Sequence, residues 1–193
     1  MNENSYINFN SLRRFCFTGI RGTGKTSLLK KVEPQNPGVY CISGSDVLRE
    51  IMGEEAYSGF EFLPEEEKYA YRLKINERLN KIQISTGKHL LVDSHLTVYN
   101  LKTGDIDNIF THRDYGFYTD LVLLDSTPEK VYQYRTKDSR KKRIVDLEII
   151  EKELEFERET AFQVAEEHGV HLHIIKMDEG AVENLSRVLC KEI

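Results

Sequence analysis

The sequence contains no tryptophan, only four prolines and only three cysteines among its 193 residues. An odd cysteine count without C-x-x-C spacing argues against a disulfide framework and a zinc site, and it indicates reduced thiols. His171 and His173 share one side of an expected strand but lack a nearby acid or thiol, so we expect structural histidines rather than metal ligands. No apolar run is long enough for a membrane helix, and residues 1–10 lack the basic-then-apolar order of an export signal. We therefore expect a cytoplasmic protein without membrane attachment.

Positive charge is also in deficit. The chain has 27 Lys and Arg against 32 Asp and Glu, a formal charge of −5. Surfaces that bind nucleic acid or acidic membranes are usually basic, so this balance argues against both kinds of partner. Apolar residues make up 39% of the chain and charged residues 31%, which is typical of a globular protein. The length suits one core, and we expect residues 1–193 to form a single domain.

Short apolar runs alternate with helical patterns along the chain. The expected strands cover residues 15–18, 39–42, 89–92, 121–124 and 170–175. The expected helices cover residues 25–32, 46–52, 65–86, 128–136, 146–168 and 181–190, with a polar turn at 43–45, a mixed loop at 53–63 and a hairpin that turns at Thr103 and Gly104. This alternation favours an α/β fold with three α/β/α layers around a five-stranded parallel sheet. Ligands of such sheets gather at the carboxyl ends of the strands.

A glycine-rich loop links the first expected strand to the first expected helix. Residues 19–26, Gly-Ile-Arg-Gly-Thr-Gly-Lys-Thr, match the P-loop pattern G-x-x-x-x-G-K-[ST] at every fixed position. Backbone N–H groups of such a loop surround phosphates, its lysine reaches the β and γ phosphates, and its threonine ligates magnesium. The pattern predicts binding of ATP with Mg²⁺. It disfavours a dinucleotide, because the dinucleotide pattern G-x-G-x-x-G needs a third glycine after Gly22 and Gly24, and Lys25, Thr26 and Ser27 follow instead. The predicted nucleotide-binding residues are Gly19, Gly22, Thr23, Gly24, Lys25, Thr26 and Ser27.

A second acid is expected opposite this loop. The apolar strand at residues 89–92 ends at Asp93, and an aspartate in that place can bind magnesium together with Thr26. Asp125 also ends an apolar strand, but it leads directly into a Thr-Pro-Glu helix start. We therefore rank Asp93 first as the magnesium acid and Asp125 second.

A basic run stands out in this acidic chain. Such a run, between two expected helices, can form a mobile cover over phosphates, although charge runs are more often solvated surface. We expect a lid at about residues 135–146, with Arg135 and Arg140 as its preferred members. The cations of the run are Arg135, Lys137, Arg140, Lys141, Lys142 and Arg143.

The order of these motifs resembles that of archaeal-type adenylate kinases and their nuclear eukaryotic relatives. The residues that carry the resemblance are the P-loop, Ile-Ser-Gly-Ser-Asp-Val-Leu-Arg-Glu at 42–50, Leu-Val-Asp-Ser-His at 91–95, and the Thr-Pro-Glu start at 127–129 with its downstream arginines. The resemblance implies transfer of the ATP γ-phosphoryl group to a nucleoside monophosphate, with Lys25, Asp93, Arg135 and Arg140 as catalytic residues. It gives Asp93 and His95 the Walker B role. It places the acceptor within residues 43–86, near Ser43, Asp46 and Arg49, with His95 also in contact.

One departure from the family pattern leaves the identity of the phosphoryl acceptor undecided. Residues 57–62, Tyr-Ser-Gly-Phe-Glu-Phe, contain no arginine where the archaeal enzymes carry one, so a second acceptor-side cation is missing unless Arg49 or Arg72 serves. The aromatic residues of this stretch could stack a ring or simply pack. The leading hypothesis is therefore a kinase for an AMP-like or related small acceptor. The runner-up is an ATPase switch with a protein or ribonucleoprotein partner. A kinase for RNA or DNA ends ranks last, because the net charge is −5.

Overall fold

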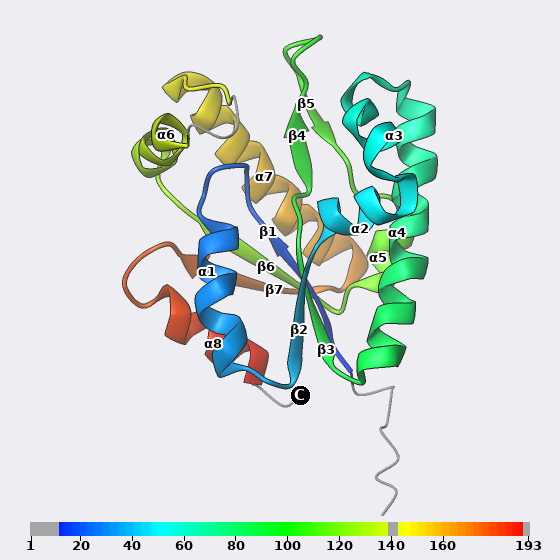
Figure 1. The fold of residues 1–193 in the computed structure, drawn as a ribbon. Coiled ribbons are helices and arrows are strands. Elements are labelled where there is room, and N and C mark those ends of the chain that lie inside the picture. The colour runs from blue at the N-terminus through cyan, green and yellow to red at the C-terminus, as the bar shows by residue number, and fades with distance from the viewer. Residues whose placement is uncertain (1–11, 139–142, 191–193) are drawn as a thin grey trace, which may run out of the picture.

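A five-stranded parallel sheet with the strand order β2-β3-β1-β6-β7 runs through the centre of the molecule (Figure 1). The structure is a computed structural model that describes residues 12–138 and 143–190. The central strands are nearly continuous apolar runs, which is typical of parallel strands covered on both faces. The expected α/β fold class is confirmed. The strands are β1 (Arg14–Thr18), β2 (Val39–Ser43), β3 (His89–Asp93), β6 (Asp120–Asp125) and β7 (His171–Lys176).

Helices cover both faces of this sheet. Phe15 and Phe17 of β1 point to the side of α1 (Lys25–Val32) and α8 (Ala181–Cys190), where they join one buried apolar cluster. Cys16, between them, points to the other side and joins a cluster that includes residues of α4 (Glu65–Thr86), α5 (His112–Phe117) and α7 (Leu147–His168). Figure 1 shows these two groups of helices on opposite sides of the strands. The alternation of side chains along β1 thus produces the three expected layers.

Several helix boundaries follow the capping signals in the sequence. Gly87 and Gly169 end α4 and α7 in the left-handed conformation, with φ of 63° and 65°. The side chain of Thr127 accepts a hydrogen bond from the backbone of Lys130 at the start of α6 (Pro128–Lys137), and Asp146 caps α7 in the same way. None of the helices in the described part of the chain is long and apolar enough to cross a membrane.

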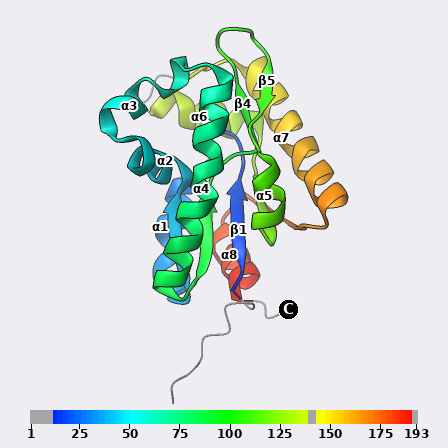
Figure 2. The same ribbon diagram turned by 90° about the vertical axis from the view of Figure 1, so that its right-hand side faces the viewer.

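The predicted hairpin is present, but the helices around it were only partly predicted. Strands β4 (Thr97–Tyr99) and β5 (Ile106–Asn108) pair antiparallel and lie beside α7 (Figure 2). Helix α2 begins at Gly44 and runs to Met52, so the predicted turn at 43–45 is wrong. The loop predicted at 53–63 is also wrong, because it contains two short helices. The elements that the sequence did not predict are α3 (Glu54–Ser58), the 3-10 helices η2 (Glu33–Gln35) and η3 (Phe60–Phe62), and α5.

The predicted isolation of His171 and His173 is wrong, because both have an acidic neighbour. Nε2 of His173 lies 2.8 Å from Oδ1 of Asp120, and Nδ1 of His171 lies 3.9 Å from the same oxygen. The register of β6 against β7 sets Asp120 opposite His171, a neighbourhood that only the sheet creates. Asp120 also binds the guanidinium of Arg13. The cluster stands where the strands begin, at the opposite sheet edge from the P-loop.

Candidate functional site

Residues 19–24 form a tight loop between β1 and α1, and its glycines are required there. Gly19, Gly22 and Gly24 have φ of 139°, 94° and 96°, a region that L side chains rarely adopt. A β-carbon on Gly24 would also come within 2.9 Å of Cε of Met177. The hydroxyl of Thr23 closes the loop by donating to the carbonyl oxygen of Ile20 at 3.0 Å. The positive φ of these glycines and this hydrogen bond therefore give the loop a tight turn, a kind of backbone conformation that can bind phosphate.

Lys25 lies inside this loop. Its ammonium group donates to the carbonyl oxygen of Gly19 and, at 3.3 Å, to that of Ile20. Oδ1 of Asp93 lies 4.0 Å from Nζ. Burial lowers the pKa of Lys25, and the charge of Asp93 acts in the opposite direction. The lysine is thus held by the loop's own carbonyl groups.

Thr26 and Asp93 are in direct contact. The hydroxyl of Thr26 donates to Oδ2 of Asp93 at 3.0 Å. The contact follows from the topology, because β3 is the neighbour of β1 and Asp93 pairs in register with Phe17, just before the loop. A hydroxyl and a carboxylate are the hard oxygen ligands that Mg²⁺ prefers, so this donor pair fits the ion. Asp125, the second candidate, instead accepts a hydrogen bond from Arg158 at 2.7 Å.

His95 lies close to the same charges. Burial, followed by the positive charges of Lys25 and Arg21, holds the pKa of His95 well below its usual range, so the ring is neutral at pH 7. Its Nδ1 atom is buried and has no hydrogen-bond partner within the described residues. Buried polar atoms are rarely left without a partner, and such an atom beside a phosphate loop points to a ligand contact.

The predicted acceptor residues stand on the other side of Asp93. Ser43 ends β2 and pairs in register with Asp93, which brings Ser43 next to the predicted magnesium acid. Its hydroxyl lies 2.8 Å from that of Ser45. Arg49 of α2 donates to Asp46 at 2.7 Å and lies 3.5 Å from a carboxylate oxygen of Glu54. The predicted acceptor residues thus lie at the end of β2 and in the helix that follows it, and Arg49 is already paired with carboxylates.

An aromatic pair extends this acceptor side. The rings of Tyr57 and Phe60 stack at 6.4 Å between centroids. The guanidinium of Arg49 lies 4.8 Å from the Tyr57 ring, and that of Arg72 lies 5.9 Å from the Phe60 ring. Arg72 also pairs with Glu65. The two cations that could replace the missing family arginine are therefore both present beside the aromatic stretch, and both are neutralised by carboxylates of the chain.

Arg135 does not behave as a lid residue. It is only 5% exposed, and its guanidinium donates to the carbonyl oxygen of Arg21 at 2.9 Å and to Glu153 of α7 at 2.7 Å. The prediction of a mobile cover is wrong for this residue, because its side chain is buried and is bonded to the loop and to α7. Arg140 lies outside the described residues. Arg143 lies near the loop, since its Nη1 would be 3.4 Å from a β-carbon on Gly22, and it pairs with Asp138.

Glu157 of α7 is a part of the site that the sequence reasoning missed. Its side chain is buried and accepts hydrogen bonds from both the start of the phosphate loop and the segment after Asp93. A signal was present, because Glu157 occupies a position on the apolar stripe of α7, between Leu154 and Ala161. A charged residue at a core-facing position needs a specific set of partners.

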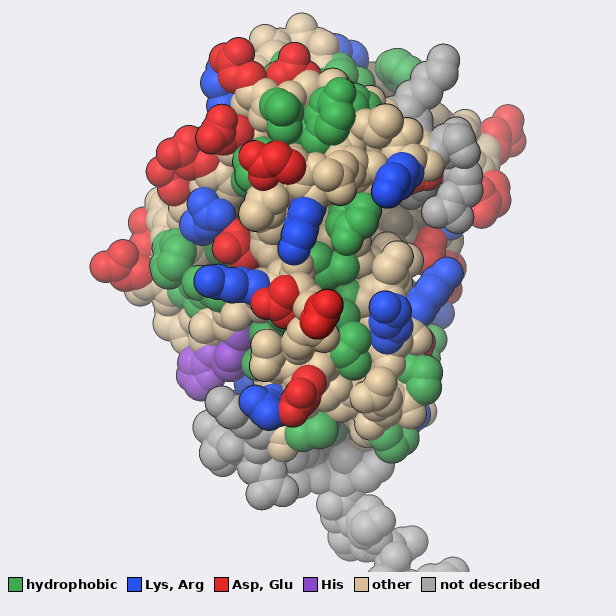
Figure 3. Space-filling model, turned by 90° about the vertical axis from the view of Figure 1, so that its left-hand side faces the viewer, with side chains coloured by type: hydrophobic (Ala, Val, Ile, Leu, Met, Phe, Trp, Pro, Cys, Tyr) green, Lys and Arg blue, Asp and Glu red, His purple; other side chains and the backbone are tan. Residues whose placement is uncertain are grey.

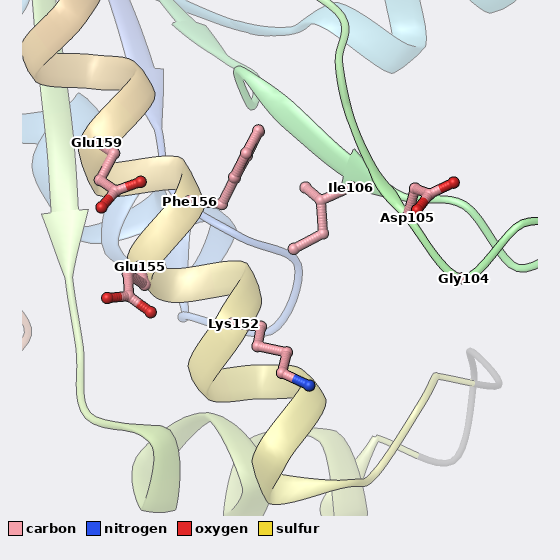
Figure 4. A pocket seen from close by; sticks show the side chains of 7 residues that line it. All are labelled: Gly104, Asp105, Ile106, Lys152, Glu155, Phe156 and Glu159. Carbon is pink, nitrogen blue, oxygen red and sulfur yellow. The ribbon is translucent and has the colours of Figure 1, made fainter.

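An open hollow of about 410 Å³ lies between the β4–β5 hairpin and α7 (Figure 4). Its charged side chains come mainly from α7 and stand at an exposed rim, and none of the predicted site residues lines it. The hollow is therefore separate from the predicted site at the loop and the strand ends. The residues around the hollow are Gly104, Asp105, Ile106, Lys152, Glu155, Phe156 and Glu159.

Comparison with known proteins gives a family and a fold. A family model described as an AAA domain matches residues 18–151. A sugar kinase from a Janibacter species superimposes with a TM-score of 0.58 at 14% identity, over 92% of this chain and 92% of that chain. A shikimate kinase from Bacteroides thetaiotaomicron gives a TM-score of 0.48 at 13% identity, over 91% of this chain and 96% of that chain. No curated protein matches the sequence. At 14% identity, the likeness to the sugar kinase extends to the fold alone.

Proposed function

The chain belongs to the AAA domain family, and we propose that it transfers the γ-phosphoryl group of ATP to a small acceptor. The observation that carries the proposal is the contact between Thr26 and Asp93, at 3.0 Å, directly beside Lys25. A phosphate loop, a lysine and an oxygen pair suited to magnesium are the components that phosphoryl transfer requires. The kinase-like fold supports the same reaction class.

The nucleotide side of the proposed reaction uses the loop. The backbone N–H groups between Gly22 and Ser27 and the start of α1 would hold the phosphates. Lys25 would leave the carbonyl groups of Gly19 and Ile20 and bind phosphate oxygens. Thr26 and Asp93 would hold Mg²⁺, which when bound neutralises charge on the phosphate oxygens.

The acceptor side is proposed to lie between α2 and the loop. Ser43 stands next to Asp93, and Arg49 lies against Tyr57, so an anionic group and a ring could be held together there. A nucleoside monophosphate has both features. In the transfer, an acceptor phosphate oxygen forms a bond to the γ-phosphorus while the bond from that phosphorus to the β–γ bridging oxygen breaks, leaving ADP. A phosphate oxygen is already ionised at neutral pH, so no general base is required.

A second function is favoured by the state of the acceptor arginines. Arg49 is paired with Asp46 and Glu54, and Arg72 is paired with Glu65. An acceptor phosphate would have to displace these carboxylates. If no acceptor phosphate displaces these carboxylates, the alternative function is an ATPase switch. In such a switch, ATP hydrolysis changes the affinity of the protein for a protein or ribonucleoprotein partner.

The face drawn in Figure 3 gives no support, among the described residues, for a nucleic-acid kinase. On the face that includes α1, α6 and α8, acidic and basic side chains are interspersed (Figure 3). A nucleic-acid track would instead gather basic side chains along one path.

The test is release of ADP from MgATP, with and without a panel of nucleoside monophosphates, nucleosides and small metabolites, with direct identification of the phosphorylated product. Strong stimulation by one acceptor, together with its phosphorylated form, is the expected result. Slow turnover that no member of the panel changes would favour the switch. Absence of any MgATP binding or turnover would overturn both functions.

A further inference from the structure

The most completely bonded buried carboxylate in the described part of the chain is that of Glu157, and it stands behind the phosphate loop. The side chain is 1% exposed. One oxygen accepts from the backbone N–H groups of Gly19 and Leu96, each at 3.0 Å, and from the hydroxyl of Thr18. The other accepts from Thr97, from its N–H at 2.8 Å and its hydroxyl at 2.5 Å. A carboxylate only accepts hydrogen bonds, so its two oxygens suit these donors.

These donors come from two separate segments that meet at the site. Thr18 and Gly19 end β1 and open the phosphate loop, whereas Leu96 and Thr97 follow Asp93 and open the hairpin. Glu157 itself comes from α7, a third element. Besides the contacts of Thr26 and Lys25 with Asp93, its carboxylate is therefore a second point at which the loop and the segment that carries Asp93 are joined.

Helix α7 holds the loop at a second point, one turn earlier. Glu153 accepts from Arg135 at 2.7 Å, and Arg135 donates to the carbonyl oxygen of Arg21 within the loop at 2.9 Å. Both glutamates lie on the buried side of α7, four residues apart. The loop is thus held at its entry by Glu157 and in its middle by Glu153 through Arg135.

We propose that Glu157 is a positioning residue that sets Thr26 and Asp93 relative to each other for magnesium. The inference rests on the proposed function. Thr26 moves with the loop that Gly19 opens, and Asp93 moves with the segment that Leu96 follows. A change in the join between these segments therefore changes the spacing of the two magnesium ligands. Groups that orient metal ligands in this way typically change metal affinity by about 10- to 100-fold when they are replaced.

The test is a comparison of Glu157→Gln with the wild-type protein. The amide keeps the size of the side chain, but in either orientation its NH₂ group takes the place of an oxygen that accepts from a backbone N–H. Dissociation constants are measured by calorimetry for ATP with Mg²⁺ and for ATP with EDTA. Folding is checked by circular dichroism and thermal melting. The quantity of interest is the ratio of the two constants, because a loss of stability alone leaves that ratio unchanged.

We expect the wild-type protein to bind ATP more tightly with Mg²⁺ than with EDTA, and this enhancement to fall by about tenfold in Glu157→Gln. Glu155→Gln, an exposed position on the same helix, is the matched control and should keep the enhancement. If Glu157→Gln does not fold, Thr97→Val removes one donor of the same cluster and should lower the enhancement by a smaller factor.

The outcomes separate the two proposals. A folded variant that melts earlier but keeps the wild-type enhancement would show that Glu157 stabilises the fold only, and would overturn this inference while leaving the proposed function intact. A wild-type protein that does not bind MgATP would overturn the proposed function, and the inference with it.

Discussion

The side chain of Arg135 lies so close to Gly22 that a β-carbon on the glycine would come within 2.8 Å of Cγ of the arginine. Gly22 has φ of 94°, so both its backbone and its neighbour exclude a side chain. Arg135 is itself fixed by Glu153 and by the carbonyl oxygen of Arg21. It cannot move away without loss of buried hydrogen bonds. The shape of the phosphate loop is therefore enforced from the side of α6 and α7.

Gly22→Ala should distort the loop. We expect a loss of about 1 to 3 kcal/mol in the free energy of unfolding, because a strained φ and a close contact are imposed together. The affinity for ATP should fall at least about tenfold. Urea unfolding and calorimetry with MgATP measure the two effects. Gly38→Ala is the control, because nothing lies within 4 Å of a β-carbon there and its φ is not positive. An alanine at position 22 that binds ATP normally would contradict the assigned loop geometry.

Lys25→Ala should remove most turnover and leave the fold intact. The ammonium group is buried, and burial lowers its pKa, so the protein loses little stability when the charge is removed. Loss of a cation on the transferring phosphate oxygens should lower kcat by about 100-fold or more. Lys30→Ala, an exposed position of α1, is the control. An unchanged rate of ADP release in Lys25→Ala would show that the loop is not the active site.

Arg49→Ala should act on the acceptor and not on ATP. The guanidinium lies 4.8 Å from the centre of the Tyr57 ring, on the proposed acceptor side. We expect KM for the acceptor to rise about tenfold or more, with KM for ATP nearly unchanged. Steady-state kinetics with the acceptor from the panel measure both constants. Arg113→Ala is a matched control, because Arg113 also forms an exposed pair with a glutamate, Glu77. Equal effects of the two variants would remove Arg49 from the acceptor site.

The fold was largely predictable from the sequence because its strands are short, apolar and well separated. The main helices carry their own boundary signals, such as the glycines at 87 and 169 and the cap at Thr127. Helices α3 and α5 were missed because helices of five and six residues are not stable alone. They depend on contacts such as the capping box between Thr111 and Asp114 and the stacking of Tyr57 on Phe60.

The site was predictable where it follows from strand order and not where it depends on distant side chains. The contact of Thr26 with Asp93 follows from two strand ends that meet at one edge of a parallel sheet. The roles of Arg135 and Glu157 do not, because their partners are 114 and up to 139 residues away in the chain. A lysine- and arginine-rich run gives no sign of which of its members turns inward. The contact of His173 with Asp120 was not predicted for the same reason, because the two residues are 53 positions apart in the chain.

Asp120 should make the protein sensitive to acid. Burial alone would raise the pKa of this carboxyl, but the hydrogen bonds from Arg13, Thr119 and His173 and the charge of Arg13 outweigh it and lower the pKa. The folded state therefore binds the proton less readily than the unfolded state. The stabilisation is complete above the unfolded pKa of about 3.9 and is lost as the pH falls toward the lower folded pKa. Each such proton adds up to about 1.4 kcal/mol per pH unit to the slope of the free energy of unfolding against pH.

Asp120→Asn separates this contribution from the rest of the acid response. At pH 7 the variant should lose about 3 to 5 kcal/mol, because Arg13 stays buried without its counter-charge. Between pH 5 and about pH 3, its free energy of unfolding should fall less steeply than that of the wild-type protein. Urea unfolding at several pH values gives both quantities.

Glu166→Gln, at an exposed position, is the control and should follow the wild-type curve. Asp114 acts with the opposite sign, because burial raises its pKa, but it is present in all three proteins and cancels in the comparison. Parallel curves for the wild-type protein and Asp120→Asn would mean that the buried pair with Arg13 does not control the acid response.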